Sequence, residues 1–263
     1  MNEYLFKNNT FLRFISSLFL IIVAITSIFK GGILLISTIS ILIFIITYEY
    51  INITENISTI FLKTSKSFLN IAIFGLSIFS FKFSIIFYIF IFFLTLFQKN
   101  NAKLNSLYVL LGPIYLCLPF IFLYNIRIND YGLEIILWFL FIVWSTDTFS
   151  FLFGKYLGGR KLLITLSPNK TWSGLICGIL LGTIISMICF YIKSYSLVDG
   201  FIYGFLLSIF TQLGDLFESW IKRKHAIKDS GSLIPGHGGF LDRLDGLLFS
   251  SILLYIGYVY YAI

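Results

Sequence analysis

Long apolar runs recur through most of this chain, and short polar segments separate them. Hydrophobic residues make up 58% of the 263 residues, whereas charged residues make up only 12%. A soluble domain carries about 25% charged residues, so this composition excludes an ordinary soluble fold. The sequence therefore predicts an all-α, polytopic integral membrane protein built as a helical bundle.

Nine of the apolar runs are long enough to cross a bilayer, which takes about 20 residues of helix. They are 11–29, 32–48, 67–81, 83–98, 107–124, 132–151, 174–192, 200–220 and 244–262. The third and fourth runs are short and are divided only near Lys82. Of all the spans, these two have the weakest signal in the sequence.

The placement of basic residues predicts how the spans are oriented. With the N-terminus in the cytoplasm, only Lys30, Lys82, Arg127 and Lys193 of the 19 Lys and Arg residues fall outside. The other fifteen lie on the cytoplasmic side, as the positive-inside rule requires. Two long polar loops then lie on the cytoplasmic face: 152–173 and 221–243.

The end of the eighth span carries polar residues on one helical face. Glu218, Ser219 and Lys222 follow Asp215 at spacings of three, four and seven, which bring all four side chains to one stripe of a helix. Carboxylates are costly within a membrane and usually serve a function there. An internal ion pair between Lys222 and either carboxylate is the alternative interpretation.

The next loop and the start of the ninth span add glycines and two further carboxylates. The run Pro235-Gly236-His237-Gly238-Gly239 predicts tight turns whose backbone N–H groups can approach a phosphate. Asp242 and Asp245, three residues apart, share a face of the following helix. Mg²⁺ accepts a few carboxylates and keeps other positions for water and substrate phosphates. For His237, contact with a phosphate, acid–base chemistry and a role confined to its own loop all stay open.

The 152–173 loop is basic and ends where the seventh span begins. Lys170 and Thr171 lie at this helix start, where an anion is favoured. Contact with a phosphate or lipid headgroup is one interpretation, and simple anchoring to anionic lipid is the other. Asp147, in the sixth span, is either a buried structural group or part of the same site.

Together these residues resemble the phosphatidate cytidylyltransferases, also called CDP-diacylglycerol synthases. The resemblance covers about residues 140–263, and Ser173 departs from it, because many relatives carry an acidic residue there. It rests on Ser167-Pro168-Asn169-Lys170-Thr171-Trp172, Gly214-Asp215, Glu218, Ser219, Lys222-Arg223, Lys228-Asp229, Pro235-Gly236-His237-Gly238-Gly239 and Asp242-Arg243-Leu244-Asp245.

The resemblance implies that CTP and phosphatidic acid in the bilayer react to give CDP-diacylglycerol and pyrophosphate. One or two Mg²⁺ ions are expected, with Mn²⁺ as a substitute. Asp215 and Asp242 are the expected ligands, and Asp245 is either a third ligand or a residue that supports the other two. These carboxylates, with Lys222 and Arg223, form the expected catalytic set. The expected substrate-binding residues are Ser167, Lys170, Thr171, Glu218, Ser219, Lys228, Asp229, His237, Gly238, Gly239 and Arg243.

On the same basis, residues 1–131 are expected to form a scaffold of about five spans, and residues 132–263 a catalytic region of about four. The resemblance implies a bacterial cytoplasmic (inner) membrane, an active site that faces the cytoplasm and no nucleic-acid partner, and it leaves a homodimer open. A membrane cation transporter or channel is the alternative from another class. The carboxylates disfavour it, because they cluster at one face and form no path across the bilayer.

Overall fold

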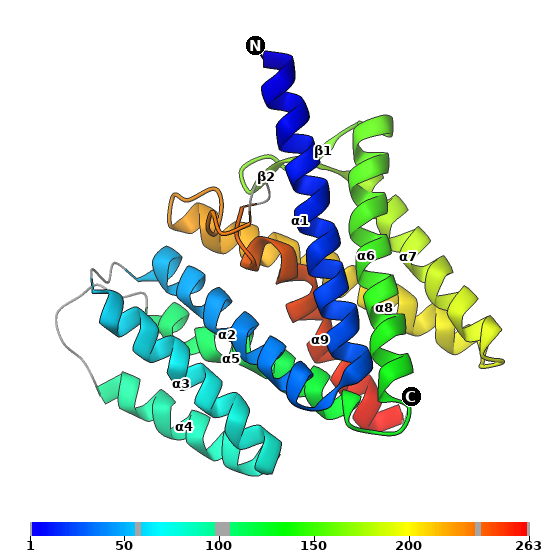
Figure 1. The fold of residues 1–263 in the computed structure, drawn as a ribbon. Helices are drawn as coiled ribbons and strands as arrows, with labels where there is room; N and C mark the ends of the chain where they lie inside the picture. The colour runs from blue at the N-terminus through cyan, green and yellow to red at the C-terminus, as the bar shows by residue number, and fades with distance from the viewer. Residues whose placement is uncertain (1, 56–58, 98–105, 235–237, 262–263) are drawn as a thin grey trace. The chain divides into compact units, whose positions relative to one another are not determined.

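The computed structural model describes residues 2–55, 59–97, 106–234 and 238–261, and within them the chain is mostly helical (Figure 1). The helices are α1 (Asn2–Lys30), α2 (Gly32–Thr54), α3 (Ile60–Phe79), α4 (Phe81–Phe97), α5 (Ser106–Arg127), α6 (Gly132–Leu157), α7 (Trp172–Ile192), α8 (Leu197–Lys224) and α9 (Leu241–Tyr261). A hairpin of two short strands, β1 (Lys161–Leu163) and β2 (Ser167–Thr171), lies between α6 and α7.

Each predicted span corresponds to one helix, to within a few residues at its ends. The division between α3 and α4 falls at Ser80, two residues before the predicted break near Lys82. Among the described residues, four helices, α2, α6, α7 and α8, are long and apolar enough to cross a membrane. The expected class, an all-α membrane protein, agrees with this architecture.

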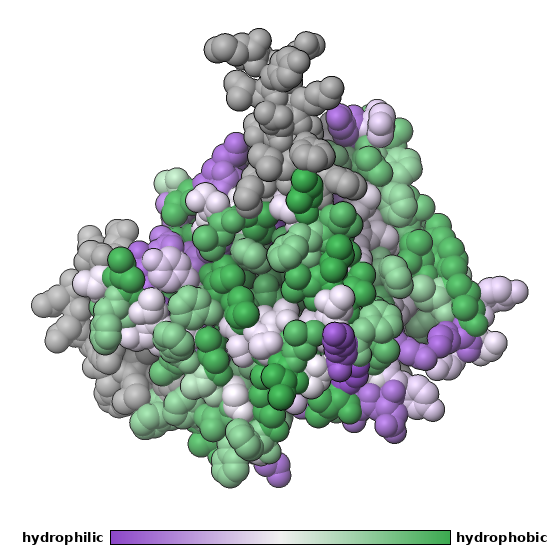
Figure 2. All heavy atoms as spheres, in the orientation of Figure 1, coloured by the Kyte–Doolittle hydropathy of each residue, from purple (hydrophilic) through white to green (hydrophobic). Residues whose placement is uncertain are grey.

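Large hydrophobic side chains are exposed along many of the helices, and they cover much of the face drawn in Figure 2. Ile33 on α2 is 86% exposed and Phe79 on α3 is 87% exposed. A soluble protein rarely exposes so much contiguous apolar surface. In a membrane protein the same surface faces lipid, which agrees with the apolar composition.

The loop predicted at 152–173 contains more structure than the sequence analysis expected. Helix α6 continues to Leu157, and β1 then pairs antiparallel with β2, which adds a small sheet to the all-α architecture. Gly158 and Gly159 adopt φ angles of 60° and 98°, and this left-handed backbone ends the helix and turns the chain. A second correction concerns the start of the loop predicted at 221–243, because α8 continues to Lys224. Lys222 therefore lies on the helix with Asp215, as their spacing predicted.

The chain forms two compact units. The first contains residues 1–124 and 225–243, and the second contains residues 125–224 and 244–263. In the first unit, α2 packs against α3 and α5. The Tyr50 and Tyr115 rings lie 6.4 Å apart, and the Asn70 amide donates a hydrogen bond of 3.0 Å to the Thr47 hydroxyl.

In the second unit, a stripe of small residues lets α7 approach α6 closely. Gly174, Gly178 and Gly182 are four residues apart and share one face of α7. A Cβ atom on Gly174 would lie 2.5 Å from the Ser150 carbonyl oxygen, and one on Gly178 would lie 2.8 Å from the Thr146 carbonyl oxygen. The two helix backbones are therefore in direct contact along this stripe.

Hydrogen bonds between side chains connect α8 to α6. The Thr146 hydroxyl bonds to the Ser208 hydroxyl at 3.0 Å, and the Gln212 amide donates to the Ser150 hydroxyl at 2.8 Å. Such bonds between helices stabilise membrane bundles by roughly 0.6 kcal/mol each. They fix how α8 faces α6, which matters because the predicted site residues lie on α8.

Replacing Gly174 with alanine should destabilise the second unit. The new methyl group would meet backbone atoms of Ser150 and Gly154, which cannot rotate away as a flexible side chain does. Overpacking of this kind costs about 1–3 kcal/mol, so the melting temperature in detergent should fall clearly. Gly75→Ala is the matched control, because nothing lies within 4 Å of its added Cβ atom. Equal melting temperatures for the two variants would contradict the close-contact account.

Candidate active site

Two glycines bring α8 and α9 together where both helices carry carboxylates. Gly214 precedes Asp215 on α8, and Gly246 follows Asp245 on α9. A Cβ atom on Gly214 would lie 2.5 Å from the Asp245 carbonyl oxygen and 3.0 Å from the Gly246 Cα atom. Any larger residue at position 214 would hold the two helices apart. The close approach therefore places Asp215 and Asp245 near each other.

A cluster of charged side chains surrounds this contact. Asp215 forms an ion pair with Lys170, with 2.6 Å between Oδ2 and Nζ, and Lys222 donates a hydrogen bond of 3.1 Å to Glu218. The Asp245 carboxyl is buried, hydrogen bonds with Glu218 and lies within electrostatic reach of Asp215 and Lys170. These five residues, all in the second unit, are called the carboxylate cluster below.

The geometry distinguishes between the two interpretations of the polar stripe on α8. The predicted internal ion pair is present between Glu218 and Lys222. Asp215 instead pairs with Lys170 of β2, and it also accepts a hydrogen bond of 3.4 Å from the Ser219 hydroxyl. Because its side chain remains 35% exposed, Asp215 can be reached from outside the bundle.

The β-hairpin and the start of α7 deliver Lys170 to the cluster. Thr171 lies at the start of α7 as predicted, and it caps the helix, because its hydroxyl accepts a hydrogen bond of 3.2 Å from the Gly174 N–H. On α8, the Arg223 guanidinium donates a hydrogen bond of 3.1 Å to the Leu166 carbonyl, which ties the hairpin to that helix. Ser167 is partly buried in β2, and its predicted contact with substrate stays a prediction.

The charges of the carboxylate cluster suit an added cation. Three carboxyl groups meet two lysine ammonium groups, and the hydrogen bond between Asp245 and Glu218 requires a proton on one of these two carboxyls. A bound cation could take the place of that proton, and carboxylate oxygens are the ligands that Mg²⁺ prefers. Among the described residues, no three His, Cys, Asp or Glu side chains form a group that could hold a metal ion by themselves. A pair of carboxylates is sufficient for Mg²⁺ when substrate phosphates and water complete its coordination.

The third predicted metal ligand, Asp242, belongs to the first unit and has a defined local role there. Its Oδ2 atom accepts hydrogen bonds of 3.0 Å from the backbone N–H groups of Ser230 and Gly239. Gly238 adopts a φ angle of 83°, and a Cβ atom on it would lie 2.9 Å from Asp242 Oδ2. Asp242 therefore holds Ser230 and Gly239 together, and its role as a metal ligand stays a prediction.

The remaining predicted substrate-binding residues lie along the same segment. Lys228, Asp229 and Arg243 are exposed, as a role in binding a soluble nucleotide requires. His237 lies outside the described residues. The Gly239 N–H, which was expected to approach a phosphate, is donated to Asp242.

Two positions that the sequence left undecided are now placed. Asp147 is exposed on α6, which excludes the interpretation that it is a buried structural group. The Ser173 hydroxyl donates a hydrogen bond to the Gly158 carbonyl and bonds to the Thr171 hydroxyl at 3.0 Å. Ser173 therefore joins the hairpin to the start of α7.

Sequence analysis overlooked Glu49, which is buried near the end of α2 and accepts hydrogen bonds from the 230–241 segment. The signal was available, since Glu49 is a carboxylate inside an otherwise apolar run. It also overlooked Gly246, which packs against Thr211 of α8. The spacing of small residues along apolar helices would have indicated such contacts.

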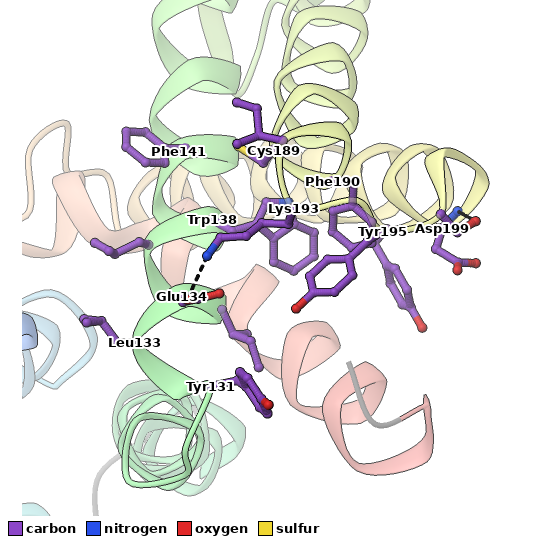
Figure 3. A pocket seen from close by; sticks show the side chains of 15 residues that line it. Tyr131, Leu133, Glu134, Trp138, Phe141, Cys189, Phe190, Lys193, Tyr195 and Asp199 are labelled. Atoms are coloured by element: carbon purple, nitrogen blue, oxygen red, sulfur yellow. Dashed lines mark hydrogen bonds and ion pairs between the residues drawn. The ribbon is translucent and has the colours of Figure 1, made fainter.

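A pocket of about 820 Å³ lies at the opposite end of α6, α7 and α8 from the carboxylate cluster (Figure 3). Its lining is mostly aromatic and aliphatic, with Trp138 and Phe190 among the larger side chains. Lys193 and Glu134 form an ion pair of 2.8 Å there, and this hydrogen bond raises the pKa of Lys193. The predicted site residues thus occupy one end of this helix group, and a largely apolar pocket occupies the other.

The fold and the carboxylate cluster define a helical membrane protein whose charged site combines carboxylates with lysines. Residues 11–261 match the model of the cytidylyltransferase family, and the chain belongs to that family.

Two similar proteins come from Rickettsia bellii, at 43% identity over 159 residues, and Staphylococcus aureus, at 40% identity over 165 residues. These matches cover 57% and 62% of this chain, and 69% and 63% of the respective relatives. A third, from Rickettsia conorii, is 38% identical over 160 residues, which are 58% of this chain and 70% of that relative. All three relatives are named phosphatidate cytidylyltransferase.

Replacing Gly214 with alanine should impair nucleotidyl transfer. The methyl group would clash with the backbone of α9 and move Asp245 away from Asp215. Misplacement of a reacting group by about 1 Å costs up to roughly a hundredfold in rate, so we expect a loss of about 10- to 100-fold. Initial rates of transfer from CTP, measured on folded protein beside Gly75→Ala, test this expectation. A variant with the wild-type rate would show that the α8–α9 contact does not set the site geometry.

Proposed function

We propose that this protein transfers the cytidylyl group of CTP to phosphatidic acid, which yields CDP-diacylglycerol and pyrophosphate. Membership of the cytidylyltransferase family and the shared name of its relatives support this function. The observation that carries it is the carboxylate cluster, because paired carboxylates beside lysines suit a reaction between two phosphate-bearing substrates. Apolar helices around the cluster suit a substrate that stays in the bilayer.

The reaction needs no nucleophile from the protein. An ionised oxygen of the lipid phosphate attacks the α-phosphorus of CTP, and the new P–O bond forms as the bond to pyrophosphate breaks. Pyrophosphate leaves with the electron pair of the broken bond, so no proton has to move. The protein must instead hold the two substrates in line and screen the charge that they bring together.

Residues of the carboxylate cluster divide these tasks by charge. Lys170 and Lys222 are only 20% and 12% exposed, so their positive charges act in a partly desolvated setting, where they stabilise phosphate oxygens strongly. Asp215 and Asp245 would hold Mg²⁺, with Asp242 as the further ligand that the sequence predicts. When bound, Mg²⁺ would neutralise phosphate charge and help to orient the triphosphate.

We further propose that all nine helices span a bacterial inner membrane and that the N-terminus and the site face the cytoplasm. The support is the excess of basic residues in the loops assigned to that side. The carboxylate cluster agrees with this orientation, because it lies at the ends of α8 and β2 that adjoin those loops. CTP is made in the cytoplasm, so the orientation would give the site its soluble substrate.

Replacing Asp215 with asparagine should abolish transfer, because the variant keeps the shape of the side chain but loses its charge toward Lys170 and a bound cation. We expect the rate to fall at least about 100-fold. Asp199→Asn is the matched control, since Asp199 is an exposed carboxylate at the other end of α8. Purified protein in detergent is assayed for labelled lipid formed from α-labelled CTP and phosphatidic acid, with Mg²⁺ or EDTA.

Lipid product that requires phosphatidic acid and Mg²⁺ would support the proposed reaction. Folded wild-type protein that yields no product over a range of lipids and metals would overturn it. Retention of the wild-type rate by Asp215→Asn would contradict the role given to that carboxylate, even if the reaction itself is found.

A further inference from the structure

Glu49 is a buried carboxylate that the proposed reaction does not use directly. It lies on α2, one of the helices apolar enough to cross a membrane, and is only 2% exposed. Burying a carboxylate is expensive unless hydrogen bonds or a counter-charge compensate for the lost water. Its partners therefore indicate what this helix position does for the protein.

All three hydrogen bonds described for Glu49 come from one segment of the first unit. Its Oε2 atom accepts from the Ser230 hydroxyl at 3.2 Å and from the Leu241 N–H at 2.9 Å, and its Oε1 atom accepts from the Phe240 N–H at 3.1 Å. These donors lie 181 to 192 residues further along the chain. Glu49 thus binds Ser230 on one side of the Pro-Gly-His-Gly-Gly run and Phe240 and Leu241 on the other.

Two of these donors belong to the beginning of α9. The first N–H groups of a helix have no partner within the helix, and their partial positive charge favours an anion. Phe240 and Leu241 supply such groups, so the Glu49 carboxylate caps α9 from another helix. A neutral amide at position 49 would offer one acceptor oxygen, whereas the carboxylate offers two.

Glycines in the segment make this approach possible. A Cβ atom on Gly231 would lie 2.6 Å from Glu49 Oε1, and one on Gly239 would lie 2.7 Å from Glu49 Oε2. The glycine at 239 is part of the Pro-Gly-His-Gly-Gly run that was expected to bind phosphate. Within the described residues it also serves to admit the carboxylate of Glu49.

Glu49 and Asp242 hold the same serine. The Ser230 hydroxyl donates to Glu49 and accepts a bond of 3.4 Å from the Asp242 N–H, while the Ser230 N–H donates to the Asp242 carboxylate. The position of Asp242, the second residue of α9, therefore depends on Glu49 both through Ser230 and through the helix cap. Asp245 follows one turn later on the same helix.

We propose that Glu49 is a positioning residue for nucleotidyl transfer. It fixes Ser230 and the start of α9 so that Asp242 can act. This role rests on the proposed function. Glu49 touches neither substrate in this account and acts through Ser230 and the α9 N–H groups.

The test compares Glu49→Gln with Glu55→Gln. Glu55 is also buried, ends the same helix and pairs with Lys66. Its variant therefore loses a buried carboxylate but keeps the Glu49 acceptors of Ser230, Phe240 and Leu241. We expect Glu49→Gln to lower kcat at least tenfold, with the KM for CTP changed less than about threefold. Glu55→Gln should keep kcat within about threefold of wild type, although its melting temperature should fall about as much as that of Glu49→Gln.

Hydrogen exchange gives a second readout that does not depend on activity. The backbone amides of 238–242 should exchange at least about tenfold faster in Glu49→Gln than in wild type, and they should be unchanged in Glu55→Gln. If the wild-type protein makes no CDP-diacylglycerol, the proposed function fails, and the exchange result alone decides whether Glu49 orders this segment. Unchanged exchange, or equal losses of kcat in the two variants, would overturn the proposal.

Discussion

Asp215 and Asp245 lie side by side because two glycines remove the side chains that would keep α8 and α9 apart. Two neighbouring carboxylates repel each other, so the contact is stable when cations compensate for their charge or when one carboxyl holds a proton. Lys170, brought in by the hairpin before α7, supplies one such charge next to Asp215. The hairpin, the cap at Thr171 and the glycine stripe on α7 all serve to place this lysine. A divalent cation and two phosphate-bearing substrates would fit the same balance of charge.

Periodicity and composition predicted the helices well, because an apolar run of about 20 residues in lipid has few alternatives to a helix. The spacing of Asp215, Glu218 and Lys222 likewise predicted one polar face on α8, and the structure confirms their clustering. These predictions depend only on local geometry, which follows directly from the spacing of residues in the sequence.

Contacts between distant segments were harder to predict. Nothing local to Glu49 shows that its partners lie nearly two hundred residues away, and nothing local to Lys170 selects Asp215 over Glu218. The β-hairpin was missed because its strands are only three and five residues long, and because it follows the left-handed glycines that end α6. The ligand roles of Asp242 and His237 stay predictions, since they depend on substrates and metal as well as on the fold.

Residues 225–243 group with the N-terminal helices, although both flanking helices lie mainly in the other unit. Residues 225–243 thus belong to the C-terminal half in sequence, whereas the carboxylate that accepts their hydrogen bonds comes from α2. A fragment that began at residue 132 would retain every residue of the family signature. It would lose Glu49, which accepts the hydrogen bonds of Ser230, Phe240 and Leu241. The half of this chain that carries the family signature is accordingly structurally incomplete without α2, since Glu49 supplies these acceptor oxygens.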